Sequence, residues 1–68
     1  MVNKNLLKSK QVLNGDTDAE LAAALGISPQ TYSAKINGKV EFIAREIKDI
    51  RNRYQLSDDD VMNIFFAD

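Results

Sequence analysis

Side chains that can form hydrogen bonds with a polar partner lie on one face of the segment 29–36. Gln30 carries a carboxamide, which both donates and accepts, and Thr31 and Ser33 carry hydroxyls. The sequence has no cysteine and no histidine, which excludes a Cys/His zinc site and histidine-based catalysis. No lysine base accompanies the serines in a recognisable nucleophile arrangement. The pattern predicts recognition without covalent chemistry, and we expect no enzyme activity, no cofactor and no metal ion.

Two short helices, over 18–25 and 29–36, are predicted to position this face. Thr17 and Glu20 have the spacing of a capping box, in which the threonine oxygen accepts from the amide of Glu20 and the glutamate reaches back. Gly26 stands where the chain must leave the first helix with a positive φ. The first helix therefore has both a start and an end signal in the sequence.

The second helix has start and end signals of its own. Ser28 can act as its N-cap, and Pro29 occupies the first helical position, where a missing N–H does no harm. Asn37 and Gly38 end it, with Gly38 as the expected left-handed C-cap. Two helices joined by a short turn with glycine are typical of the helix-turn-helix motif.

This segment resembles the lambda-repressor/Cro (XRE-type) DNA-binding family. The residues that carry the resemblance are Thr17, Glu20, Leu21, Ala22, Leu25, Gly26, Ile27, Ser28, Pro29, Thr31, Ser33, Asn37 and Gly38. A small phage-encoded branch of the family is similar to the later segment in Glu46, Ile47, Ile50, Leu56, Ser57, Val61, Ile64, Phe65 and Phe66. The resemblance implies a lambda-repressor-like fold and a phage or prophage regulator of a lysis–lysogeny type of switch. We accordingly expect it in the cytoplasm of a bacterial host cell.

The apolar pattern predicts an all-α fold, a compact bundle of five short helices in a single domain over 1–68. The predicted helices cover about 3–13, 18–25, 29–36, 43–54 and a last segment after the N-cap Ser57. The side chains expected to converge in one core are Leu21, Leu25, Tyr32, Ile36, Ile47 and Ile50. Helical spacing adds Ile43 and Tyr54 to the stripe of the fourth helix and places Leu6 and Leu13 on one face of the first. Pro29 is predicted to face inward with Tyr32.

Most of the candidate DNA contacts are residues of 29–37 that face away from this core or flank that outward face, and Thr17 and Lys39 lie outside the segment. For base edges they are Gln30, Thr31, Ser33 and Ala34, and for the phosphate backbone Thr17, Lys35, Asn37 and Lys39. A carboxamide can pair with both N6 and N7 of adenine, and a small apolar side chain fits a thymine methyl. The alternative is that these side chains are merely solvated. For Asn37, ending the helix and contacting phosphate are equally supported and mutually compatible.

Charge leaves a second hypothesis open. The net charge is −1, whereas DNA-binding domains are commonly basic. Asp18 stands where relatives often have a neutral residue facing DNA, and an aspartate there repels phosphate. Phe66 must either fold back or remain exposed as a contact patch, because adjacent Phe65 competes for the same apolar face. The chain is therefore either an operator-binding regulator, expected to bind double-stranded DNA as a homodimer, or an antirepressor that engages a partner repressor.

Other partners are not expected. The segment 1–10 has no apolar stretch of the signal-peptide kind, and no apolar run approaches ~18 residues, so we expect neither secretion nor membrane insertion. Asp58, Asp59 and Asp60 lack the spacing of a calcium loop and fit a solvated first helical turn better. No pattern indicates a small-molecule substrate.

Overall fold

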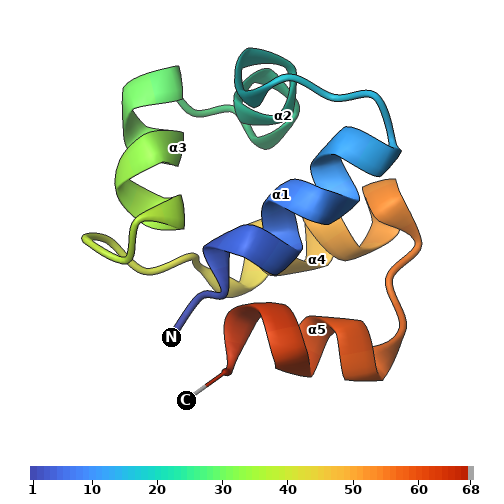
Figure 1. The fold of residues 1–68 in the computed structure, drawn as a ribbon. Coiled ribbons are helices and arrows are strands. Elements are labelled where there is room, and N and C mark those ends of the chain that lie inside the picture. The colour runs from blue at the N-terminus through green and yellow to red at the C-terminus, as the bar shows by residue number, and fades with distance from the viewer. Residues whose placement is uncertain (68) are drawn as a thin grey trace.

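The computed structural model describes residues 1–67 and contains five helices (Figure 1). They are α1 (Lys4–Leu13), α2 (Asp18–Leu25), α3 (Pro29–Ile36), α4 (Ala44–Tyr54) and α5 (Asp58–Phe65). No strand occurs in this part of the chain. The predicted all-α bundle is confirmed, α2 and α3 have the predicted bounds, and α1 and α4 each begin one residue later than predicted. In Figure 1, α3 lies at one side of the bundle, α5 runs along the bottom and the start of the chain lies near the C-terminal end of α5.

Side-chain caps fix where the helices begin. The Thr17 hydroxyl oxygen accepts from the amide of Glu20 at 3.1 Å, and the Glu20 carboxylate accepts from the amide of Thr17 at 3.0 Å. Ser57 and Asp60 make the same reciprocal pair at the start of α5. These bonds satisfy amides that a helix leaves without an internal partner, and a cap of this kind contributes about 1 kcal/mol.

A short turn joins α2 to α3. Gly26 has φ +73°, a left-handed conformation that strains residues with a Cβ atom. The next amide, of Ile27, donates back to the carbonyl of Ala22 at 3.0 Å, which closes the end of α2. Ser28 then caps α3 by accepting from the amide of Thr31 at 3.1 Å. The direction of α3 relative to α2 is thus set by hydrogen bonds within the turn.

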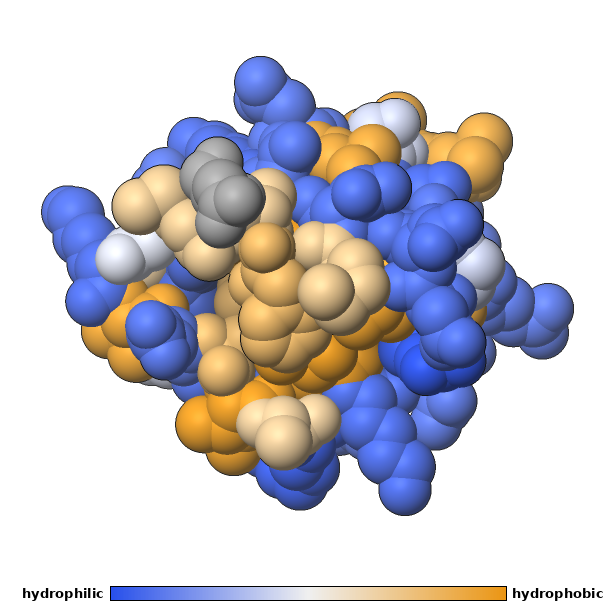
Figure 2. Space-filling model, turned by 90° about the horizontal axis from the view of Figure 1, so that it is seen from below, coloured by the Kyte–Doolittle hydropathy of each residue, from blue (hydrophilic) through white to orange (hydrophobic). Residues whose placement is uncertain are grey.

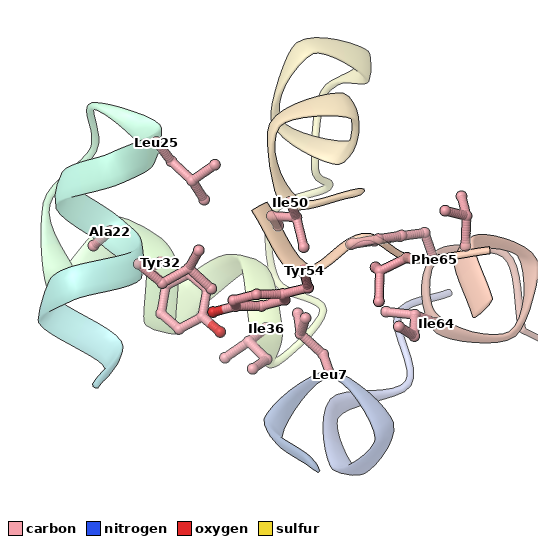
Figure 3. Close-up of a cluster of buried hydrophobic side chains, with 12 residues drawn as sticks. Leu7, Ala22, Leu25, Tyr32, Ile36, Ile50, Tyr54, Ile64 and Phe65 are labelled. Carbon is pink, nitrogen blue, oxygen red and sulfur yellow. The ribbon is translucent and has the colours of Figure 1, made fainter. Parts of the chain in front are cut away.

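All five helices contribute to one apolar core (Figure 3). Its buried members are Leu7, Leu21, Ala22, Leu25, Tyr32, Ile36, Ile50, Tyr54, Leu56, Val61, Ile64 and Phe65. Phe42 in the α3–α4 loop packs edge-on to the rings of both Tyr32 and Phe65. Five of the six predicted core residues are fully part of this cluster, and Ile47 packs against it while only partly buried.

Three expectations about the inward faces were wrong. Leu13 is 79% exposed, because α1 turns Leu7 and Gln11, one helical turn apart, toward the core instead. Ile43 is 51% exposed, because it is the extended N-cap of α4 and its side chain does not follow the helical spacing of the stripe. Pro29 is also exposed at the start of α3.

A polar cluster ties the α1–α2 connection to the end of α4. The guanidinium of Arg53 donates to both carboxylate oxygens of Asp16, at 2.6 and 2.8 Å, and the Tyr54 hydroxyl donates to the same carboxylate at 2.6 Å. The hydrogen bond from Arg53, and to a smaller extent the one from Tyr54, lower the pKa of Asp16 to about 2. This cluster fixes the segment that leads into α2.

Candidate nucleic-acid interface

The outer face of α3 carries the polar side chains selected from the sequence. Gln30, Thr31 and Ser33 are exposed and Ala34 is half-buried. They face outward because Tyr32 and Ile36, one helical turn apart, are both buried against the rest of the bundle. Position on the helix therefore brings the four candidate base contacts together on one surface.

Local hydrogen bonds orient part of this face. The Ser28 hydroxyl donates to the Thr31 hydroxyl oxygen at 3.0 Å, and this holds Thr31 at the N-terminal end of α3. The exposed Gln30 occupies the neighbouring position in the first turn. Thr17 is exposed as well, but its hydroxyl oxygen already accepts from the amide of Glu20. A phosphate contact from Thr17 would have to come from its hydroxyl hydrogen, because its backbone N–H is bonded to Glu20.

Lys35 is not on this surface, and its expected phosphate contact is revised. The side chain is buried, and its ammonium donates to the Glu46 carboxylate at 2.6 Å and to the carbonyl of Glu41 at 3.4 Å. It also lies 6.0 Å from the centre of the Phe42 ring. Since Lys35 follows Tyr32 by one helical turn, it shares the inward side of α3. The sequence shows that spacing, but it does not show that the carboxylate of Glu46 accepts from Lys35.

The start of α2 holds a second polar network that sequence reasoning missed, buried at Tyr32 and Gln11 and exposed at Asp18. The Tyr32 hydroxyl donates to Gln11 at 2.7 Å, and the amide of Gln11 donates to the Asp18 carboxylate, also at 2.7 Å. Lys8 forms an ion pair with the same carboxylate. The bonds from Lys8 and then Gln11 lower the pKa of Asp18, and burial raises the pKa of Tyr32.

This network reduces the repulsion that Asp18 exerts on a nearby anion. The sequence suggested an uncompensated negative charge, whereas the carboxylate is paired with the ammonium of Lys8. The pair is close to neutral at long range, so Asp18 repels phosphate less than expected and Lys8 attracts it less. The negative charge of Asp18 at the start of α2 is therefore largely compensated.

Two lysines other than Lys35 place positive charge at the C-terminal end of α3. Asn37 caps the helix, and its side-chain amide donates to the carbonyl of Ser33 at 2.8 Å. Its side-chain oxygen accepts from the ammonium of Lys4, in α1, at 2.9 Å. Lys39 follows two residues later and is exposed. Asn37 thus ends the helix, as one of its two interpretations required, and Lys4 joins a site to which the sequence did not assign it.

An apolar area lies on a different side of the molecule. Figure 2 looks at the side of the molecule where α5 lies, and apolar side chains form a continuous area bordered by hydrophilic ones. Phe66 is 55% exposed and Met62 57% exposed, so Phe66 takes the exposed alternative. Next to Phe66 is a groove of about 270 Å³, lined by Met1, Val2, Lys35, Gly38, Val40, Glu41, Phe42, Ile47, Phe65 and Phe66.

No family model and no curated protein matches this chain. Over residues 1–67, the structure has no helix that is both long and apolar enough to cross a bilayer. The same residues bring together no set of acidic side chains suited to holding a metal ion.

Proposed function

We propose that this protein is a transcriptional regulator of the lambda-repressor/Cro-like class, phage or prophage in origin, which binds operator DNA. In this proposal α2 and α3 form a helix-turn-helix unit and α3 is the recognition helix. The observation that carries the proposal is the division of α3 into a buried side, with Tyr32 and Ile36, and an exposed polar side. That division leaves hydrogen-bonding groups pointing away from a helix that the turn holds firmly.

The dimensions of α3 suit this role. It is a helix of eight residues, about 12 Å long at 1.5 Å per residue, and since a helix with its side chains is about 10–12 Å across, a major groove about 12 Å wide admits it. Its N-terminal residues are those that a recognition helix brings to base edges. Gln30 would pair with adenine, Thr31 and Ser33 would bond to bases or phosphate, and Ala34 would contact a thymine methyl.

Contacts to the DNA backbone would come mainly from the end of α3. Lys39 supplies charge, and Asn37 and Thr17 supply hydrogen-bonding groups. A symmetric dimer on a palindromic operator follows from the way such proteins read two half-sites about 34–36 Å apart. No cofactor is required for this kind of binding.

Selection from a library of random duplexes, followed by titration of the selected sequence, tests the proposal. Gln30→Ala should lose ~1–3 kcal/mol on the selected duplex and relax the choice of base at one position. Asn52→Ala is the matched control, since it removes an exposed carboxamide from α4. Failure of the unaltered protein to prefer any duplex, or equal effects of the two variants, would count against α3 as the reader.

A second candidate is a protein-binding modulator, such as an antirepressor that engages another repressor. The exposed Met62 and the exposed Phe66, which lines the groove, favour it, because apolar areas rimmed by polar residues are typical of protein contacts. In this case Phe66→Ser would abolish binding to the partner repressor and leave DNA binding unchanged. Titration of DNA with and without host or phage repressors separates the two candidates.

A further inference from the structure

We propose that Lys4, in the first turn of α1, is a phosphate-contacting residue of the DNA site and acts together with Lys39. This inference depends on the proposed function and adds to it a contact from outside the α2–α3 segment. The two lysines place the positive charge of the site at the C-terminal end of α3.

Hydrogen bonds at its side chain and at the start of α1 set the position of Lys4. Its ammonium donates to the side-chain oxygen of Asn37 at 2.9 Å, and Asn37 is itself bonded to the carbonyl of Ser33. The start of α1 is fixed because the Asn3 side chain accepts from the amide of Leu6, and the Asn3 amide donates to the carbonyl of Ile64. The ammonium is therefore held at the exit of α3, although 33 residues separate Lys4 from Asn37.

The ammonium also has hydrogen-bonding capacity to spare. A lysine has three N–H donors, and Asn37 accepts one. Both side chains are exposed at this point, so a phosphate oxygen can reach the remaining donors. Asn37 would then contact the same part of the backbone, in keeping with the role assigned to it from the sequence.

The other lysines of α1 differ from Lys4 in their partners. Lys8 is paired with Asp18, and the ammonium of Lys10 lies 3.7 Å from the Asp60 carboxylate. Within residues 1–67, no carboxylate lies at ion-pair distance from the Lys4 ammonium. Asp18 interacts with Lys4 only by longer-range electrostatic attraction. Its charge is thus available to an approaching anion, whereas the charges of Lys8 and Lys10 are largely compensated.

A purely structural role for Lys4 is the competing explanation. A cation near a helix C-terminus interacts favourably with the helix dipole, so Lys4 could simply stabilise the end of α3. The two roles differ in the salt dependence of DNA binding. Each phosphate that a lysine neutralises releases counterions and adds about 0.9 to the magnitude of the negative slope of log K against log salt concentration, whereas helix stabilisation leaves that slope unchanged.

The test is a titration of a selected duplex and a random duplex between 50 and about 200 mM salt, as for other DNA-binding proteins. It compares the unaltered protein with Lys4→Gln, Lys4→Arg and the control Lys48→Gln. Lys48 is an exposed lysine of α4, so its substitution changes the net charge equally. Lys4→Gln should reduce the magnitude of the slope by about 1, and should weaken binding to both duplexes by the same factor, about 5–10-fold near 0.1 M salt. Lys4→Arg should retain the slope, and Lys48→Gln should change it far less.

Two results would overturn the inference while leaving the proposed function standing. One is an unchanged slope for Lys4→Gln in a protein that still binds DNA, and the other is an equal loss in Lys48→Gln. If the unaltered protein binds neither duplex, the proposed function itself fails and the role of Lys4 fails with it. Thermal melting of each variant reports whether the α3 end has lost stability, and a changed melting temperature with an unchanged slope supports the structural role alone.

Discussion

The ammonium of Lys35 lies 2.6 Å from the carboxylate of Glu46, and both side chains are buried. The pair links α3 to α4, so the helix with the proposed reading face is fixed by an ion pair as well as by apolar packing. The same Glu46 carboxylate accepts from the amide of Ile43 at 3.0 Å, which caps the start of α4. One acidic side chain therefore serves the position of α3 and the beginning of α4.

Removing only one member of this pair should be costly. Lys35→Met would leave the Glu46 carboxylate buried without its cation, with an expected loss of about 3–5 kcal/mol in the free energy of unfolding. The double variant Lys35→Met/Glu46→Gln should recover most of the loss, because glutamine keeps an oxygen for the amide of Ile43. Urea denaturation measures both values. A loss below about 1 kcal/mol, as expected for the exposed pair of Arg45 and Asp49, would show that the buried charge is compensated by other means.

Leu25 is expected to be essential to the stability of the core. It is only 2% exposed at the end of α2, and Leu25→Ala should lower the free energy of unfolding by ~2–5 kcal/mol through lost burial and a residual cavity. That is a large share of the stability of so small a domain. Leu13→Ala is a close control, since Leu13 is 79% exposed and should cost less than about 0.5 kcal/mol. Equal melting temperatures for the two variants would contradict the core assignment.

Acid should weaken the fold through Asp16. Its pKa is lowered from 3.8 to about 2, so the charged form is stabilised in the folded state. The corresponding stability is fully present above pH 3.8 and is lost as the pH falls through 2. Because Arg53 is 40% exposed and solvent screens it, we expect a contribution of about 1–2 kcal/mol. Asp16→Asn should be less stable than the unaltered protein at pH 7, and the difference should narrow between pH 4 and pH 2. A difference that does not vary with pH would contradict the assignment.

Asp18 distinguishes the two candidate functions. Asp18→Asn would release Lys8 from its ion pair and add a positive charge near the start of α2. For an operator-binding protein, affinity for all duplexes should rise and become more salt-dependent. For a modulator that presents this acid to a basic partner, complex formation should slow instead. Stopped-flow and equilibrium measurements at two salt concentrations decide it. Unchanged DNA binding with a weakened protein complex would leave the modulator as the supported function.

The sequence alone determined the local structure because the relevant signals lie within a few residues of one another. The Thr17–Glu20 capping box, the glycine at 26 and the Ser28 cap each act over one helical turn, and α2 and α3 have the bounds that they predict. Helical spacing likewise identified most of the core, since Tyr32 and Ile36 must share a face wherever the helix is placed. The polar outer face of α3 followed from the same periodicity.

Only the tertiary structure decided which charges are compensated. The partners of Lys35, Asp18 and Lys4 are 11, 10 and 33 residues away in the chain, and helical periodicity carries no information at those separations. The pair with Glu46 in α4 makes Lys35 a buried cation and not a surface one, and the bond to Asn37 holds the Lys4 ammonium of α1 at the candidate site. Whether a charged side chain faces water or a carboxylate depends on how helices are arranged in space, and burial makes that arrangement decisive because an unpaired buried charge is too costly to retain.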